Sequence, residues 1–420
     1  MKFREIQLEN GLQIVAECNP RAYAASLGFF VNTGSRDETD EISGVSHFLE
    51  HMVFKGTPRR TAADVNRELD EIGSHSNAFT AEENTVYFAT VLPEYQDRAL
   101  DLLSDIMRPS LRDDDFETEK QVILEEIYKY DDQPPYGAHE KCMEAYFQGH
   151  PLGRNILGTV ESVSGLTCES MHRYFQQRYS PGNITLVATG NVDFDRLVEN
   201  ANLHCGTWEP FETQRTVIPS RCREDFRVIH KASATQQYVV QISDGPDVMD
   251  ADRYAARVLS TILGDDSGSR LFWELVETGR AEFVGVGNYE FEGAGILMTY
   301  LSCAPERTAD NLCRIREVFL NAERNGVTSA ELEQAQSKIS SHIVLANERS
   351  SNRLFVVGSN WLQRRDYRTI REVIDSYEAV SCDDVARILS KFPLSRNTAV
   401  AVGPLETLQM AEVSKKACGE

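Results

Sequence analysis

The segment from Gly44 to Phe54, GVSHFLEHMVF, contains two histidines four residues apart, with a glutamate directly before the second. Residues three and four positions apart on a helix share one face, with Cβ atoms about 5–6 Å apart. His47 and His51 can therefore hold one metal ion, and Glu50 is close enough to take a proton from a water molecule at that metal. The spacing predicts a helix that carries a metal site, which needs a third ligand from elsewhere in the chain.

The length and composition predict a globular protein of more than one domain. A chain of 420 residues is too long for one ordinary domain, and 41% hydrophobic with 26% charged residues allows extensive cores. No apolar run approaches the about 20 residues that a membrane-spanning helix needs, and the first ten residues have no apolar signal core. We therefore expect a cytoplasmic protein that does not bind membranes.

The cysteines and the charge narrow the class further. The nine cysteines are scattered, odd in number and without a CxxC pair, which favours reduced thiols over disulfides or a cysteine zinc site. The formal net charge of −22 repels phosphate backbones, so nucleic acid is not an expected partner. This charge fits either solubility alone or an acidic cavity that favours basic peptides, and composition does not separate the two.

Turn signals and periodicity predict alternating strands and helices in the first half. The sequence around Asn10-Gly11 predicts a hairpin over residues 5–16, and strands are expected near 25–31, 76–80 and 84–91. Helices are expected at 62–72 and 93–106, and Ser43 is expected to cap the helix of the histidine motif.

A helix predicted from Asp113 to Tyr130 supplies a candidate third ligand. Glu119 and Glu126 are two turns apart and share the apolar side of this helix, where a carboxylate is costly unless it is paired or binds a metal. Glu126 is therefore the candidate, although such a glutamate standing alone would more often pair with an arginine. The expected apolar stripe consists of Phe116, Val122, Ile123, Ile127 and Tyr130.

The two halves of the chain end alike, which predicts an internal duplication. The strand from Asn183 to Gly190 resembles that from Asn397 to Gly403, and the two final glycines are 213 residues apart (403 − 190). Residues 209–225 read as a linker, so we expect domains at 1–212 and 213–420. The same offset carries Glu126 to Ile339, so the second domain is expected to lack the metal site.

Several segments, spread over nearly the whole length of the chain, match the motifs of one known protein family. These are Gly34-Ser-Arg-Asp-Glu38, the histidine motif with Lys55-Gly-Thr57, Asn77-Ala-Phe-Thr80, Glu119–Glu126 and His150–Gly153. With them the chain resembles the pitrilysin/insulysin family of zinc metallopeptidases, whose His-x-x-Glu-His order defines the inverzincins. In size it is similar to half-clamshell members such as bacterial processing-peptidase-like proteins and mitochondrial processing peptidase. In that family the third ligand follows the second histidine by 75 to 77 residues, and Glu126 follows His51 by 75 (126 − 51).

The resemblance implies an α+β fold of two homologous α/β domains, each a mainly antiparallel sheet packed against helices, forming one half of a clamshell. It implies one Zn²⁺ per chain, held by His47, His51 and Glu126, with Glu50 as general base. Glu119, seven residues before the third ligand as in the family, would orient a ligand or reinforce the negative potential.

The resemblance also implies a peptide-binding edge strand. Asn77, Ala78 and Phe79 match the family's exposed strand, to which the substrate backbone adds through main-chain hydrogen bonds. From the sequence alone, an ordinary edge strand after a turn is the alternative.

One departure from the family concerns the second domain. Many active members carry an arginine there, followed seven residues later by a tyrosine, which hold substrate and stabilise the oxyanion. Val276 and Phe283 stand at these positions and cannot donate hydrogen bonds, and using Arg280 would require a register shift. We therefore expect a heterodimer in which a homologous partner supplies the Arg/Tyr pair, with a weakly active homodimer as the alternative.

The sequence thus predicts a zinc-dependent endopeptidase that hydrolyses unfolded peptides or oligopeptides in a closed chamber. Clearance of oligopeptides is favoured over trimming of defined leader sequences. The alternative is a non-catalytic or partner-dependent structural subunit of a peptidase-like complex. Such subunits usually lose motif residues, whereas His47, Glu50, His51 and Glu126 are all present here. A zinc-independent binding protein with a chance motif is the weakest alternative.

Overall fold

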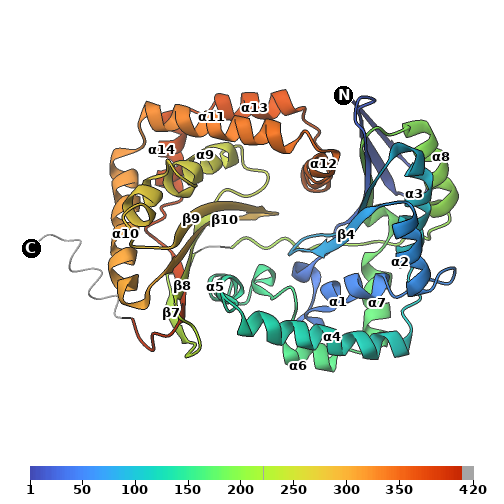
Figure 1. Ribbon diagram of the computed structural model, residues 1–420, viewed down its shortest axis with the longest axis horizontal. Coiled ribbons are helices and arrows are strands. Elements are labelled where there is room, and N and C mark those ends of the chain that lie inside the picture. Colours follow the sequence, from blue (N-terminus) through green and yellow to red (C-terminus); the bar gives the residue numbers. More distant parts are fainter. Residues whose placement is uncertain (221, 409–420) are drawn as a thin grey trace, which may run out of the picture. The chain divides into compact units, whose positions relative to one another are not determined.

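The computed structural model describes residues 1–220 and 222–408 and divides into two compact units, each with its own sheet (Figure 1). Unit 1 comprises Met1–Lys129, Arg154–Thr216 and Leu345–Arg368. Unit 2 comprises Tyr130–Gly153, Val217–Val344 and the chain from Thr369 onward. Residues 130–153 and 345–368 are therefore exchanged between the two halves of the sequence. The expected division into 1–212 and 213–420 assigned each of these two segments to the half of the sequence in which it lies.

The sheet of unit 1 is mixed but mainly antiparallel, with the order β1-β2-β6-β3-β5-β4. Only β2 and β6 are parallel within it, and β4 forms one edge. The predicted hairpin joins β1 to β2, with Gly11 at a φ of +92° that favours glycine. The strands are β1 (Lys2–Gln7), β2 (Gln13–Cys18), β3 (Ala25–Val31), β4 (His75–Thr80), β5 (Thr85–Val91) and β6 (Ile184–Gly190).

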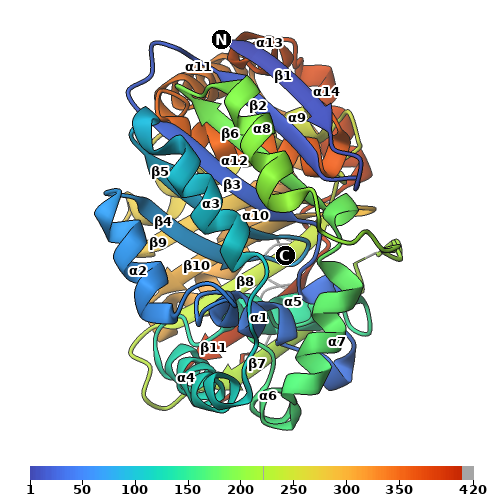
Figure 2. The same cartoon turned by 90° about the vertical axis from the view of Figure 1, so that its right-hand side faces the viewer.

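Helices cover both faces of this sheet. Helices α3 and α8 lie over one face, as Figure 2 shows, and with α1 and α7 they enclose the main core of the unit. The opposite face packs against α12, which comes from the second half of the sequence. The helices of unit 1 are α1 (Val45–Val53), α2 (Ala62–Glu71), α3 (Gln96–Ile106), most of α4 (Asp113–Asp132), α6 (Val160–Gly165), α7 (Cys168–Arg178), α8 (Phe194–Cys205) and α12 (Ser350–Arg364).

Helix α12 is attached by apolar packing and by one buried ion pair. Leu354 and Val357 pack in a cluster with Phe30 of β3 and its neighbours. Arg353 forms three hydrogen bonds of 2.6–2.9 Å with the carboxylate of Glu17 on β2, and both side chains are at most 4% exposed. Because a charge in such a place is costly without its partner, this pair fixes the position of α12 on the sheet.

Unit 2 repeats the architecture of unit 1. Its sheet has the order β7-β11-β8-β10-β9, with one parallel pair, β11 and β7, and reproduces the order β2-β6-β3-β5-β4. Helix α9 covers one face and α5, from the first half of the sequence, covers the other. The expectation of two homologous α/β domains with mainly antiparallel sheets is confirmed. The strands are β7 (Phe226–His230), β8 (Gln237–Gly245), β9 (Phe283–Phe291), β10 (Ala294–Cys303) and β11 (Thr398–Gly403), and the helices are α5 (Ala138–Tyr146), α9 (Arg253–Gly264), α10 (Thr308–Asn325), α11 (Ser329–Ala346, its last two residues in unit 1), α13 (Ile370–Glu378) and α14 (Cys382–Lys391).

Two local expectations differ from the structure. Val122 and Tyr130 of α4 are 46% and 53% exposed, because consecutive helical residues are about 100° apart and Ile123 and Ile127 take the buried side. Gly44, at a φ of +92°, occupies the N-cap of α1 in place of the expected Ser43. In unit 2, residues Phe272–Val276 form a π-helical turn.

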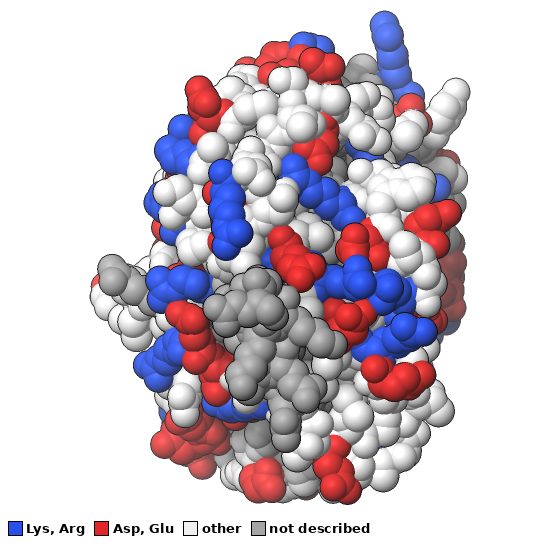
Figure 3. Space-filling view, turned by 90° about the vertical axis from the view of Figure 1, so that its left-hand side faces the viewer, with Lys and Arg blue, Asp and Glu red and all other residues white. Residues whose placement is uncertain are grey.

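The described residues contain no membrane-spanning helix, and the face in Figure 3 shows no concentrated acidic area. No helix in the described residues is long and apolar enough to cross a membrane. Lysine and arginine are interspersed with aspartate and glutamate over the face shown in Figure 3, so the net charge of −22 is not gathered into one acidic area there.

We predict that Arg353→Ala destabilises the protein by about 3–5 kcal/mol, because it leaves the buried carboxylate of Glu17 without a charged partner and with only the hydrogen bond from the Tyr367 hydroxyl. Urea unfolding followed by circular dichroism measures the loss. Arg371→Ala, in an exposed ion pair on α13, serves as the control and should leave the midpoint unchanged. An unchanged midpoint for Arg353→Ala would contradict the role given to this ion pair.

Candidate metal centre

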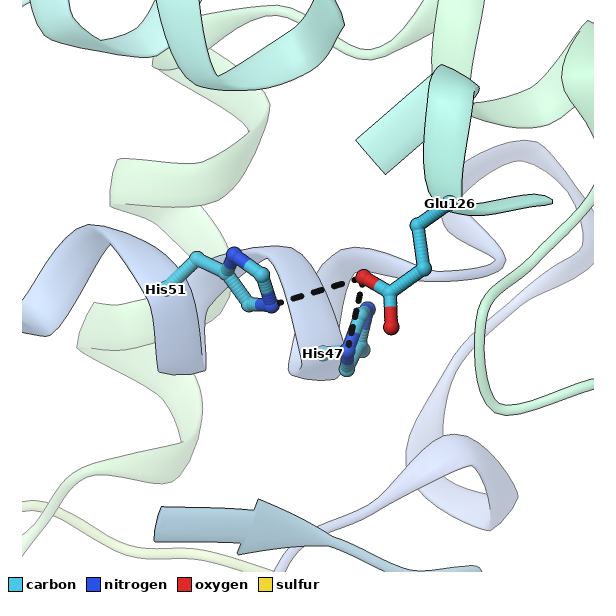
Figure 4. Close-up of side chains that lie close together, drawn as sticks. All are labelled: His47, His51 and Glu126. Atoms are coloured by element: carbon cyan, nitrogen blue, oxygen red, sulfur yellow. Dashed lines mark ion pairs between the residues drawn. The ribbon is translucent and has the colours of Figure 1, made fainter. Parts of the chain in front are cut away.

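Helices α1 and α4 bring together the three predicted ligands (Figure 4). Nε2 of His47 and Nε2 of His51 lie 3.9 and 3.7 Å from the same oxygen, Oε2 of Glu126. The ligand atoms of all three residues lie within 4.8 Å of one another, and in the described residues this is the one such group of three or more. The two helices are aligned by Phe48 and Phe116, whose stacked rings have centroids 4.6 Å apart.

This donor set fits a zinc ion. Zinc bonds to histidine nitrogen and carboxylate oxygen at about 2.0–2.2 Å in tetrahedral geometry, so two donors on one ion are about 3.5 Å apart. The separations of 3.9 and 3.7 Å need only small side-chain movements to reach that value. Two nitrogens and one oxygen leave a fourth position open, as hydrolytic zinc sites require.

The two histidines have opposite electrostatic environments. Burial, together with the neighbouring His51, lowers the pKa of His47 to about 3, so this ring is neutral and ready to bind a metal. Burial acts in the same direction on His51, but the hydrogen bond to Glu119 and the charges of Glu119, Glu126 and Glu50 outweigh it. These carboxylates raise the pKa of His51 above its ordinary value of 6.5.

Glu119 binds His51 at Nδ1, the ring nitrogen that does not face Glu126. Its Oε1 lies 2.8 Å from Nδ1 of His51, while its other oxygen pairs with the ammonium group of Lys55. Burial disfavours the charged form of Glu119, but the hydrogen bonds to His51 and Lys55 lower the pKa of this carboxyl. An ionised carboxylate only accepts hydrogen bonds, so Nδ1 of His51 is the donor and Nε2 is left free for the metal.

Glu50 lies beside the ligand group without belonging to it. The hydroxyl of Thr80, at the end of β4, donates a 2.6 Å hydrogen bond to Oε2 of Glu50. Burial raises the pKa of Glu50 above its usual range, although the hydrogen bond from Thr80 opposes this. A carboxylate with a raised pKa is suited to accept a proton and later to return it.

The start of α1 is held by a buried carboxylate six residues before its N-cap. The two oxygens of Glu38 accept hydrogen bonds from the backbone N–H groups of Gly44 and Ser46, at 2.7 and 2.8 Å. Burial raises the pKa of Glu38 to about 8, opposed by these two bonds. The loop from Gly34 to Glu38 also holds the β4–β5 turn, since Arg36 N–H donates to the carbonyl of Glu82 at 2.8 Å.

Strand β4 carries the three residues expected to bind substrate and forms an edge of the sheet in the described residues. Ala78 is 8% exposed and belongs to the core, so its side chain is not accessible to a ligand. Phe79 is 40% exposed and lies near Phe355 of α12, with ring centroids 5.7 Å apart. Asn77 is exposed and points to the same face of the strand as Phe79.

The second-domain positions that differ from the family lie in unit 2. Val276 is partly buried at the end of the π-helical turn, and Phe283 is 52% exposed at the start of β9. Arg280 forms a 2.6 Å ion pair with Asp310. Arg280 is thus already engaged within its own unit, which argues against the register shift.

Comparison with known proteins decides the family. Residues 13–160 match the family model described as insulinase, peptidase family M16, and residues 165–339 match the model of the peptidase M16 inactive domain. A protein of Mycobacterium tuberculosis named an uncharacterized zinc protease is 35% identical over 96% of this chain and 93% of its own length. The chain belongs to peptidase family M16.

One further relative and two solved structures extend the comparison. A protein of Bacillus subtilis, also named a zinc protease, is 32% identical over 90% of this chain and 92% of its own length. A Helicobacter pylori protease has a TM-score of 0.89 at 23% identity, covering 96% of this chain and 99% of that one. A Pseudomonas fluorescens structure titled peptidase M16 inactive domain has a TM-score of 0.90 at 16% identity, covering 97% and 99%. At these identities the two structures share the fold.

Sequence reasoning gave no role to three residues that the structure places around this candidate metal centre. These residues are Glu38, Lys55 and Thr80, and each lies in a segment that carries the family resemblance. Glu38 lies six residues before the N-cap of α1, so no local pattern marked it as the residue that holds this helix. The contacts of Lys55 and Thr80 depend on partners 64 and 30 residues away (119 − 55 and 80 − 50), which no local pattern identifies.

We predict that zinc affinity falls about tenfold per pH unit below the raised pKa of His51, because one proton must leave that ring before the metal binds. His47 is already neutral in this range, so log Kd should change with a slope of about one. Zinc titration against a competing chelator, at several values between about pH 5 and 6.5, measures the slope. In Glu119→Gln the onset should move to lower pH, because a neutral amide supports the charged imidazole less. A slope of two would contradict the prediction.

Proposed function

We propose that this chain is a zinc-dependent endopeptidase that hydrolyses peptide bonds in unfolded peptides and oligopeptides, with one Zn²⁺ per chain. The observation that carries the proposal is the convergence of His47, His51 and Glu126 beside Glu50, a carboxylate that lies outside the ligand group. Two histidines and one glutamate are a ligand set of zinc hydrolases. The M16 membership and the relatives named zinc proteases support the same reaction.

The chain's own residues divide the chemistry between them. A bound zinc ion supplies a Lewis acid, which polarises the substrate carbonyl and makes water a nucleophile near neutral pH. Glu50 accepts the proton of the attacking water and then delivers it to the leaving amine. Glu119 orients His51 and, together with Lys55, keeps its Nε2 directed toward the metal position.

The edge strand β4 suggests how a peptide is held. An extended peptide can add to β4 through main-chain hydrogen bonds, which depend little on its sequence. Only an unfolded segment can present its backbone in this way, so folded proteins are excluded as substrates. Asn77 and Phe79 then contact the side chains on one face of the peptide, which favours a broad preference over a strict one.

We further propose that this chain acts in the cytoplasm as half of a closed chamber completed by a homologous partner. The partner supplies the arginine and tyrosine that Val276 and Phe283 cannot replace. The pairing of Arg280 with Asp310 supports this assignment, because it leaves unit 2 without a substitute at that place. A homodimer would lack both donors and would be a weak peptidase.

A structural subunit is the second candidate function. The absence of hydrogen-bond donors at Val276 and Phe283 is the observation that favours it. Against it stands the metal centre, in which Glu50, Glu119 and Lys55 are all placed around the ligands. A subunit that only supports assembly does not need a general base, such as Glu50, that is held in place by a hydrogen bond.

We predict that Glu50→Gln retains stoichiometric zinc but loses hydrolysis of a quenched fluorescent peptide by about 10²–10⁴-fold, because the amide cannot accept the proton. Metal analysis and initial rates on the same samples measure both quantities. Glu125→Gln, an exposed carboxylate on α4, is the matched control and should behave as the unsubstituted chain. Full zinc with no hydrolysis that depends on Glu50, under any pairing, would favour the structural subunit.

We predict that adding a homologous chain with arginine and tyrosine at the matching positions raises peptide hydrolysis by about 10²–10³-fold or more, the usual effect of an oxyanion donor. Rates are compared for this chain alone, the homologue alone and the mixture, with co-elution in gel filtration as the test of assembly. Equal rates for the chain alone and for the mixture would contradict the heterodimer.

A further inference from the structure

Glu50 is held in place by a residue of another element. In the described residues, the hydroxyl of Thr80 is the only hydrogen-bond donor to the carboxylate of Glu50, at 2.6 Å from Oε2. Both side chains are partly buried, so water is a limited alternative partner. Without Thr80, no other hydrogen bond in the described residues would fix the rotation of that carboxylate.

The backbone of Thr80 is itself fixed from two sides. It pairs with Thr85 at the end of the β4–β5 hairpin, and the next residue, Ala81, donates to the carbonyl of Asn84 at 2.8 Å. The turn is bound to the loop that follows β3, because Ser35 N–H donates to the carbonyl of Ala81 at 3.3 Å. A Cβ atom at Gly34 would lie 2.1 Å from that carbonyl oxygen, so only glycine allows the approach.

The alternation of β4 directs Thr80 toward α1. Thr80 shares its face with Ala78, which packs in the core of unit 1, whereas Asn77 and Phe79 point to the opposite face. The strand that offers its edge to a peptide therefore also presents a hydroxyl to the proposed base. Strand β4 would therefore contact both the bound peptide and the proposed base, Glu50.

We propose that Thr80 is a positioning residue, whose hydroxyl occupies Oε2 of Glu50 and leaves Oε1 directed at the metal position for proton transfer. This inference rests on the peptidase function proposed above. A misplacement of about 1 Å in a reacting group can cost about 10²-fold in rate, so fixing one torsion of Glu50 has a measurable effect on the chemical step. Because Thr80 does not touch the metal ligands, zinc binding does not depend on it.

The test compares three variants of the full chain in its most active pairing. In Thr80→Val the hydroxyl is lost and the shape is kept, and kcat should fall about 10- to 100-fold with KM within about twofold. Thr80→Ser keeps the hydroxyl and should recover most of kcat. Thr90→Val removes a hydroxyl of β5 that binds Ser26 instead, and should leave kcat unchanged. Zinc content and thermal midpoint should match the unsubstituted chain in all three.

A crystal structure of Thr80→Val provides a readout that does not depend on turnover. Glu50 should leave its position or occupy several rotamers, whereas in Thr80→Ser it should remain where it is. An ordered, unmoved Glu50 in Thr80→Val, or an unchanged kcat, would overturn the inference. A loss of zinc or of thermal stability that explains the fall in kcat would also overturn it. If the unsubstituted chain shows no hydrolysis that depends on Glu50, the proposed function fails, and the crystal structure still decides the role of Thr80.

Discussion

The contact between the carboxyl group of Glu38 and the first backbone N–H groups of α1 fixes the geometry on which the candidate metal centre depends. The N-terminus of a helix carries partial positive charge and unsatisfied donors, and a buried acceptor there contributes about 1 kcal/mol or more. Ser46, bound by Glu38, directly precedes His47, so a rotation of α1 about its axis would break the contact and move both histidines together. The stacking of Phe48 on Phe116 then sets α4, and with it Glu126, against the same helix.

The loop from Gly34 to Glu38 supports two functional elements at once. Its last residue holds the helix of the two candidate histidine ligands, while Gly34 and Arg36 hold the turn that begins after Thr80. Arg36 adds a buried ion pair with Glu83 in the same turn. The loop from Gly34 to Glu38 thus helps to position both the candidate ligands and the proposed base. This explains why a loop that contains no ligand forms so many hydrogen bonds. Pre-organisation of this kind lowers the cost of bringing reactants into register.

The contacts that could be predicted from the sequence are those between residues a few positions apart, or those that follow from a repeating pattern. His47 and His51 are four residues apart, so the helical repeat alone places them together, and the side of α4 that carries Glu126 follows from the same repeat. The duplication was visible because both halves close with a similar strand. The partners of Glu38 and Thr80 could not be predicted. Glu38 lies six residues before the helix end that it binds and Thr80 lies on another element than Glu50, so neither contact produces a repeating sequence pattern. Val122 shows the opposite error, in which a hydrophobic residue was assigned to a face that its neighbour Ile123 occupies.

The exchange of α5 and α12 between the halves has a consequence for biosynthesis. The sheet of unit 1 is complete once β6 ends at Gly190, yet the helix that covers Phe30, Phe88 and Val187 begins only at Ser350. While the intervening residues emerge from the ribosome, one apolar face of that sheet has no cover from its own unit. A nascent chain in this state exposes a hydrophobic surface of the kind that chaperones bind. The histidine motif is thus among the first parts of the protein to be made, but its unit can close only after α12, Ser350–Arg364, has been made.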